Sequence, residues 1–65
     1  MKIMVNGKEM AVEEGATVET LLESLGLSDK RVAVEHNRVI LARDAYGTPL
    51  NEGDVIEIIS FVGGG

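Results

Sequence analysis

The chain has no cysteine among its 65 residues. This absence excludes disulfides, thiolate zinc sites and a cysteine nucleophile. Aromatic residues are nearly absent as well, because Tyr46 and Phe61 are the only ones. A domain of this length buries only a small core, and here that core must be built from Val, Ile, Leu and Met.

Positive charge is scarce: 6 Lys and Arg against 11 Asp and Glu give a net charge of -5. Binding to nucleic acid or to an anionic membrane surface is therefore not expected, since both need a basic surplus. An acidic surface is compatible with a basic partner surface, and equally with plain solubility. No apolar run approaches the roughly 20 residues that span a bilayer. We expect a cytoplasmic protein that is a monomer when alone.

Two alternating segments, residues 2–6 and 8–13, surround the dipeptide Asn6-Gly7. This dipeptide favours a type I′ turn, so the segments predict a β-hairpin. A short helix is predicted over residues 18–25, with Thr17 as its N-cap and Gly26 just beyond its end. Its apolar stripe is expected to comprise Val18, Leu21, Leu22 and Leu25.

Further strands are predicted in "RVAVEHN" (31–37), "RVIL" (38–41) and "VIEIISFV" (55–62), with an irregular segment at 42–54. The last of these is nearly continuous in apolar character, which suggests a central strand packed on much of both faces. One helix and several strands in this order predict an α+β fold, in which a single helix covers one face of a mixed sheet of four to five strands.

The last strand also contains a glutamate, Glu57, and a charged side chain is almost never buried without a partner. We therefore expect Val55, Glu57, Ile59 and Phe61 on the open face of the sheet, and Ile56, Ile58, Ser60 and Val62 toward the helix. Ile59 and Phe61 then form an exposed apolar patch, which is typical of a partner surface. Ordinary packing against a loop is the alternative.

Catalytic or metal-binding groups are not apparent in the sequence. His36 is the only histidine, and a lone histidine is most often structural or solvent-facing. The acidic residues Glu52 and Asp54 are interpreted as solvated turn residues. No glycine-rich phosphate loop is present, and no bound cofactor or metal is expected.

The terminal glycines Gly63, Gly64 and Gly65 have no predicted structural role, unlike the five others, which lie at predicted turns or helix ends. One interpretation is a frayed terminus. The other is a thin arm that could enter a narrow channel and present the α-carboxylate of Gly65. That carboxylate is inert until activated, for instance as a mixed anhydride with AMP.

The segments "TVETLLESLGL" (17–27), "VAVEHN" (32–37) and "GDVIEIISFVGGG" (53–65) resemble the small ubiquitin-like sulfur carriers, most closely the thiamin-pathway ThiS family. The resemblance covers essentially the whole chain. It implies a β-grasp domain over residues 1–62, with the first and last strands parallel and adjacent, and a flexible glycine tail at 63–65.

The resemblance also implies a function without catalytic residues in this chain. A ubiquitin-activating-type enzyme would use ATP to adenylate Gly65, and a cysteine desulfurase system would supply sulfur for a thiocarboxylate. Thiazole synthase would receive that sulfur. Gly63 and Gly64 would thread the partner active sites, while Ile59, Phe61 and Val62 would bind partners. The alternatives are a carrier for molybdopterin synthesis or tRNA thiolation, and a ubiquitin-like binding module.

Overall fold

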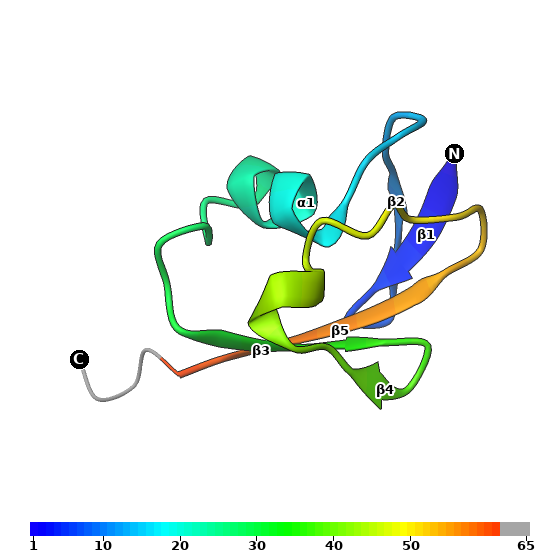
Figure 1. Ribbon diagram of the computed structural model, residues 1–65. Helices are drawn as coiled ribbons and strands as arrows, with labels where there is room; N and C mark the ends of the chain where they lie inside the picture. Colours follow the sequence, from blue (N-terminus) through cyan, green and yellow to red (C-terminus); the bar gives the residue numbers. More distant parts are fainter. Residues whose placement is uncertain (62–65) are drawn as a thin grey trace.

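The structure is a computed structural model that describes residues 1–61, and within that range it contains one α-helix and one five-stranded sheet (Figure 1). The elements in chain order are β1 (Lys2–Val5), β2 (Lys8–Ala11), α1 (Val18–Ser24), β3 (Val32–His36), β4 (Val39–Ile40), a 3-10 turn η1 (Arg43–Ala45) and β5 (Val55–Ser60).

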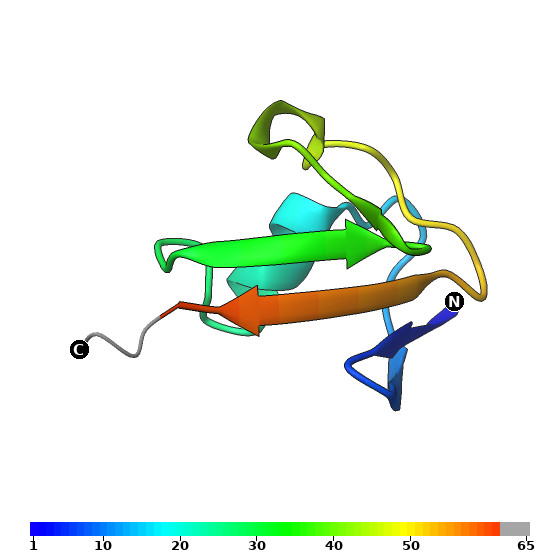
Figure 2. The same cartoon turned by 90° about the horizontal axis from the view of Figure 1, so that it is seen from below.

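The strand order in the sheet is β2-β1-β5-β3-β4. The first and last strands, β1 and β5, are adjacent and parallel, and the other pairs are antiparallel. The helix α1 covers one face of the sheet, and Figure 2 shows β3 and β5 side by side with the helix behind them. The arrangement confirms the expected α+β class and the β-grasp topology.

The hairpin between β1 and β2 turns at Asn6 and Gly7, whose φ angles are 51° and 83°. Both angles are positive, as a type I′ turn requires, and few residues other than Asn and Gly adopt them at low cost. The turn predicted from this dipeptide is confirmed, and it sets the register of the hairpin.

Two threonines start helix α1. The Thr17 side chain accepts a hydrogen bond from the Thr20 amide at 3.1 Å, and the Thr20 hydroxyl accepts one from the Thr17 amide at 2.9 Å. This reciprocal pair satisfies amides that a helix start leaves unpaired. At the other end Leu25 is the C-cap and is 40% exposed. The helix predicted over residues 18–25 therefore ends one residue earlier, at Ser24, and of the predicted apolar stripe Val18, Leu21 and Leu22 are buried whereas Leu25 is not.

The hydrophobic core lies between α1 and the sheet, and the segment 42–54 covers one end of it. It consists of Ile3, Val18, Leu21, Leu22, Val34, Tyr46, Leu50, Ile56 and Ile58. Backbone hydrogen bonds hold the closing segment in place, from the Leu50 amide to the Ala16 carbonyl and from the Glu19 amide to the Tyr46 carbonyl. The segment is therefore irregular, as predicted, but it contributes two core side chains.

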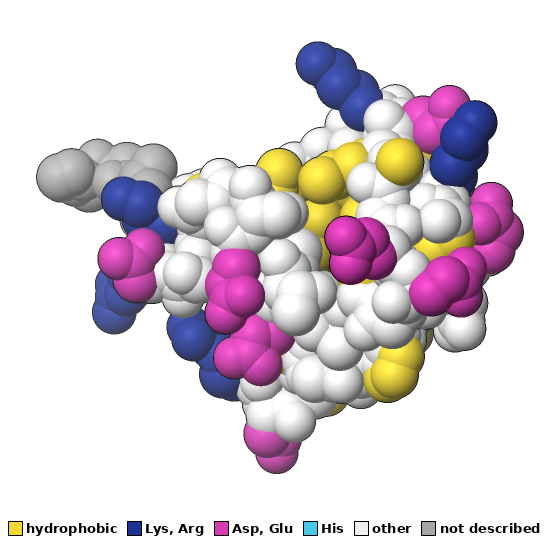
Figure 3. All heavy atoms as spheres, turned by 90° about the horizontal axis from the view of Figure 1, so that it is seen from above, with side chains coloured by type: hydrophobic (Ala, Val, Ile, Leu, Met, Phe, Trp, Pro, Cys, Tyr) yellow, Lys and Arg dark blue, Asp and Glu magenta, His cyan; other side chains and the backbone are white. Residues whose placement is uncertain are grey.

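The strand β5 is central in the sheet and buries only one of its faces. Ile56 and Ile58 are buried, whereas Val55 and Ile59 are 41% and 50% exposed. The expectation of packing on both faces was wrong, because the single helix leaves the opposite face uncovered. On the helix side, Figure 3 shows acidic side chains scattered around small apolar areas.

Candidate functional site

The open face of the sheet carries the candidate site. Ile59 and Phe61 are predicted from the sequence to lie on this face, and in the structure they are 50% and 57% exposed. Phe61 follows β5 directly, and its amide donates to the Arg31 carbonyl at 2.9 Å, so pairing with the chain before β3 continues through Phe61. The proposed sites Val62, Gly63, Gly64 and Gly65 lie outside the described residues, as does the predicted boundary between domain and tail.

Strand register decides which other side chains share this face. Ala33 lies opposite Ile59, and Glu35 lies opposite Glu57. On the outer edge of the sheet, Ile40 lies opposite Glu35 and is 71% exposed. The open face therefore combines exposed aliphatic side chains with two carboxylates that face each other across neighbouring strands.

The position of β5 within the sheet is fixed on one side by β1 and by the side chain of Asn6. The Asn6 amide donates to the Ile56 carbonyl at 2.9 Å. Beyond that bond, the Asn6 side chain accepts from the Ile58 amide at 2.7 Å and donates to the Ile58 carbonyl at 3.3 Å. The Asn6 side chain thus makes hydrogen bonds to β5 beyond the end of β1, in place of the backbone of the next residue in a longer strand.

A second polar cluster fixes the start of β5. Nε2 of His36 lies 2.7 Å from Oδ2 of Asp54, and the same oxygen accepts from the Asn51 amide at 2.8 Å. The other carboxylate oxygen accepts from Asn37, whose own side-chain oxygen accepts from the Val55 amide. His36 is therefore structural, as the sequence favoured. The interpretation of Asp54 as a solvated turn residue was wrong, since it is buried and fully bonded.

The charge of Asp54 is stabilised despite its burial. Burial raises the pKa of this carboxyl, but the hydrogen bonds from the Asn51 amide, His36 and Asn37, together with the charge of His36, outweigh it. The pKa of Asp54 therefore lies below its ordinary value of 3.8. Hydrogen bonds to a carboxylate favour its ionised form in this way.

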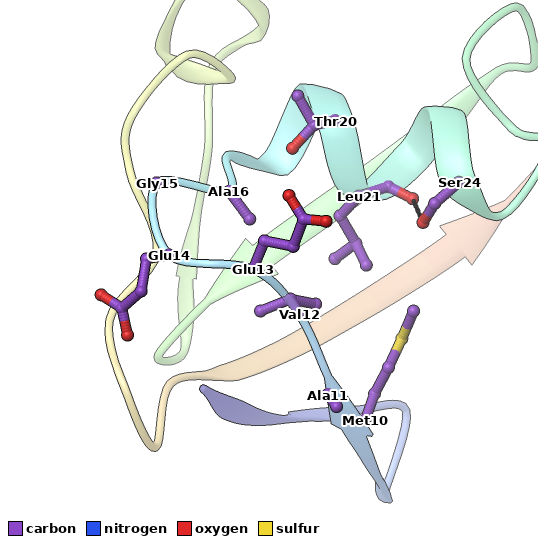
Figure 4. Close-up of a pocket in the computed structure, with 10 residues that line it drawn as sticks. All are labelled: Met10, Ala11, Val12, Glu13, Glu14, Gly15, Ala16, Thr20, Leu21 and Ser24. Carbon is purple, nitrogen blue, oxygen red and sulfur yellow. Dashed lines mark hydrogen bonds between the residues drawn. The ribbon is translucent and has the colours of Figure 1, made fainter.

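A surface pocket of about 410 Å³ lies on the other side of the sheet, between β2, the following loop and α1 (Figure 4). Its apolar lining includes Met10, Val12 and Leu21, and the side chain of Glu13 lies among them. The pocket is separate from the open face.

Over residues 1–61 no group of three or more His, Cys, Asp or Glu side chains could hold a metal ion, and no helix there is long and apolar enough to cross a membrane.

Similarity to known proteins extends over almost the whole chain. The sequence profile of the ThiS family matches residues 3–65. This chain belongs to the ThiS family. A ThiS-family relative, the sulfur carrier protein ThiS of Bacillus subtilis, is 40% identical over 97% of this chain and 98% of its own length. The crystal structure of a ThiS thiamine biosynthesis protein from Geobacter metallireducens superimposes with a TM-score of 0.82, at 36% identity and with both chains fully covered.

Another relative of this ThiS-family chain is much longer. The thiazole synthase of Magnetococcus marinus is 46% identical over 100% of this chain, and that match spans only 20% of the synthase. The chain therefore corresponds to about a fifth of that protein. In this relative, a ThiS-like segment is part of a polypeptide named for thiazole synthesis.

Several residues of the open face and its supports were missed in the sequence. The sequence predicts Ile40 only as part of a strand, and no signal in it marks the pairing of Glu35 with Glu57. Asn6 was predicted for its turn conformation alone. These roles depend on register between strands that are far apart in the sequence, which local periodicity does not specify.

Proposed function

We propose that this chain is a sulfur carrier in thiamin biosynthesis and that it delivers sulfur to thiazole synthase. The single observation that carries the proposal is the match to the ThiS family over residues 3–65, since it includes both the folded domain and the terminal glycines. The relatives named sulfur carrier protein ThiS support it, and the thiazole synthase that contains a similar segment supports the choice of partner.

The proposed chemistry takes place at the α-carboxylate of Gly65. The carboxylate attacks the α-phosphate of ATP in the active site of an adenylating enzyme, and pyrophosphate leaves. A persulfide supplied by a cysteine desulfurase system then attacks the acyl adenylate and displaces AMP, which forms an acyl disulfide. A thiol of the sulfur-transfer system reduces this acyl disulfide, so the thiocarboxylate is released and the thiol ends as a disulfide with the persulfide's carrier. The chain is a co-substrate in this scheme, and the catalytic groups and the ATP site belong to its partners.

The open face of the folded domain also supports this scheme. Ile59 and Phe61 lie on or directly after β5, so a partner that covers them is already close to the chain leading to Gly65. Apolar patches of this kind commonly mark protein contacts. We propose that Ile59, Phe61 and Val62 dock the partner while Gly63 and Gly64 pass into its active site.

Mass spectrometry tests the chemistry directly. The intact chain is incubated with the adenylating enzyme of the same organism, ATP and a sulfur donor, and the C-terminal peptide is then analysed. We expect a mass gain equal to the difference between sulfur and oxygen at Gly65, and none without ATP or in a variant extended by one alanine after Gly65. An unmodified chain, with an enzyme that modifies another ThiS-family protein, would overturn the proposal.

Genetics separates thiamin synthesis from the other sulfur-transfer pathways. Deletion of the gene is expected to make growth depend on added thiazole, and expression of the intact chain is expected to restore growth without it. A deletion strain that instead lacks molybdopterin or tRNA thiolation, and grows without thiazole, assigns the carrier to another pathway.

A further inference from the structure

Two glutamates face each other at the centre of the open face. Glu35 on β3 and Glu57 on β5 are paired directly in the antiparallel register. Directly opposite side chains on one face of a sheet have Cβ atoms only about 5 Å apart, and like charges at such positions destabilise the pairing. We refer to Glu35 and Glu57 as the acidic pair.

No described residue neutralises the acidic pair. Across residues 1–61 the one ion pair within 4.0 Å joins His36 and Asp54, which lie elsewhere. The side chains of Glu35 and Glu57 take part in none of the side-chain hydrogen bonds among the described residues. Within residues 1–61, the repulsion between the two carboxylates is therefore screened by solvent alone.

Aliphatic side chains surround the acidic pair on three sides. Ile40 lies across from Glu35 on the outer strand, while Val55 and Ile59 flank Glu57 along β5. All three are at least 41% exposed. A partner that covers these side chains also covers the two carboxylates, and removing carboxylates from water is costly unless a cation accompanies them.

We propose that the acidic pair and its apolar rim bind an arginine presented by an apolar surface of thiazole synthase; this inference rests on the proposed function and specifies its docking site. A guanidinium presents several donors in one plane, so it can bond two neighbouring carboxylates at once. The overall charge of -5 fits a basic partner surface. Complementary charge at an interface fixes its register and speeds association.

The experiment compares two double variants with the same change in charge. Glu35→Gln/Glu57→Gln removes the acidic pair, and Glu14→Gln/Glu23→Gln removes two exposed carboxylates from the loop and helix on the other side of the sheet. Binding of each purified variant to purified thiazole synthase from the same organism is measured at low and high salt.

We expect the loss of the acidic pair to weaken binding by about tenfold or more at low salt and to reduce its salt dependence. The control variant should bind like the wild type, apart from a small general charge effect. Equal affinities for the two double variants would overturn the proposal, as would a loss of affinity for the adenylating enzyme with none for thiazole synthase.

Thermal unfolding provides an independent readout. Because the two carboxylates repel each other, the variant without the acidic pair should melt at a higher temperature than the wild type, even though it binds more weakly. A lower melting temperature would contradict the repulsion and the proposal with it.

Thiocarboxylate formation at Gly65 is measured in parallel. If it proceeds in every variant while the affinities are equal, the docking inference fails and the carrier function stands.

Discussion

Nε2 of His36 lies 2.7 Å from Oδ2 of Asp54 and thereby joins the end of β3 to the start of β5. The residues are 18 positions apart, and the carboxylate that links them is buried. Asn37 completes the link, because it bonds both Asp54 and the Val55 amide. The strand that leads to the proposed carrier tail therefore begins in a fixed position.

Removal of this carboxylate should destabilise the fold. Asp54→Ala leaves the Asn51 amide and the Asn37 and His36 side chains without their acceptor, so we expect a loss of about 1–3 kcal/mol in the free energy of unfolding. Asp29→Ala, which removes an exposed carboxylate, should change it by less than about 0.5 kcal/mol. Urea unfolding checks both values, and equal stability of the two variants would contradict the role of the cluster.

The same carboxyl predicts a dependence of stability on pH. The pKa of Asp54 is lowered by folding, so its ionised form stabilises the native state above 3.8 and that contribution is lost as the pH falls through the native pKa. The difference in unfolding free energy between the wild type and Asp54→Asn should therefore be largest near neutral pH and should shrink below 3.8. Unfolding measured at several pH values tests this, and a difference that grew in acid would be inconsistent with it.

Asn6 has two roles that can be measured separately. Asn6→Gly keeps the positive φ accessible but removes the two hydrogen bonds to Ile58, which should cost about 1–2 kcal/mol. Asn6→Ala should cost more, since alanine also adopts the positive φ of this position less readily than asparagine or glycine. Amide exchange at Ile58 should accelerate in both variants. An Asn6→Gly variant as stable as the wild type would show that the side-chain bonds contribute nothing.

Phe61 should matter more for partner binding than for stability. Its side chain is 57% exposed, so Phe61→Ala is expected to reduce the unfolding free energy by less than about 1 kcal/mol and to weaken partner binding by about tenfold. Ile56→Ala, on the buried face of β5, should cost about 2–5 kcal/mol. Denaturation and titration with the purified adenylating enzyme and thiazole synthase check this contrast. A large loss of stability in Phe61→Ala would refute its assignment to a docking surface.

The proposed passage of the glycine tail through partner active sites predicts an effect of a single methyl group. Gly64→Ala should slow thiocarboxylate formation by about tenfold, equivalent to about 1.4 kcal/mol in the activation barrier. Gly47→Ala is the matched control, because its Cβ would meet no atom within 4 Å and its φ is not positive. Time courses of modification followed by mass spectrometry compare the two. Equal rates would argue against a narrow channel.

The sequence by itself determined the features that depend on a few neighbouring residues. Asn6-Gly7 selected the hairpin turn, and Thr17 placed the start of the helix, since both act through backbone angles and hydrogen bonds within four residues. Alternation around Glu57 also predicted that Ile59 and Phe61 would be exposed. The resemblance carried by the last strand and the glycines identified the family.

Only the tertiary structure decided how distant segments meet. The bonds of Asp54 to His36 and Asn37, the contact of Asn6 with Ile58 and the pairing of Glu35 with Glu57 all join residues 17 or more positions apart. A shift of one residue in strand register would exchange the two faces of β5, and local periodicity does not fix that register between strands. The helix, the turn and the alternation are local, whereas the open face with its acidic pair exists only once the five strands are aligned.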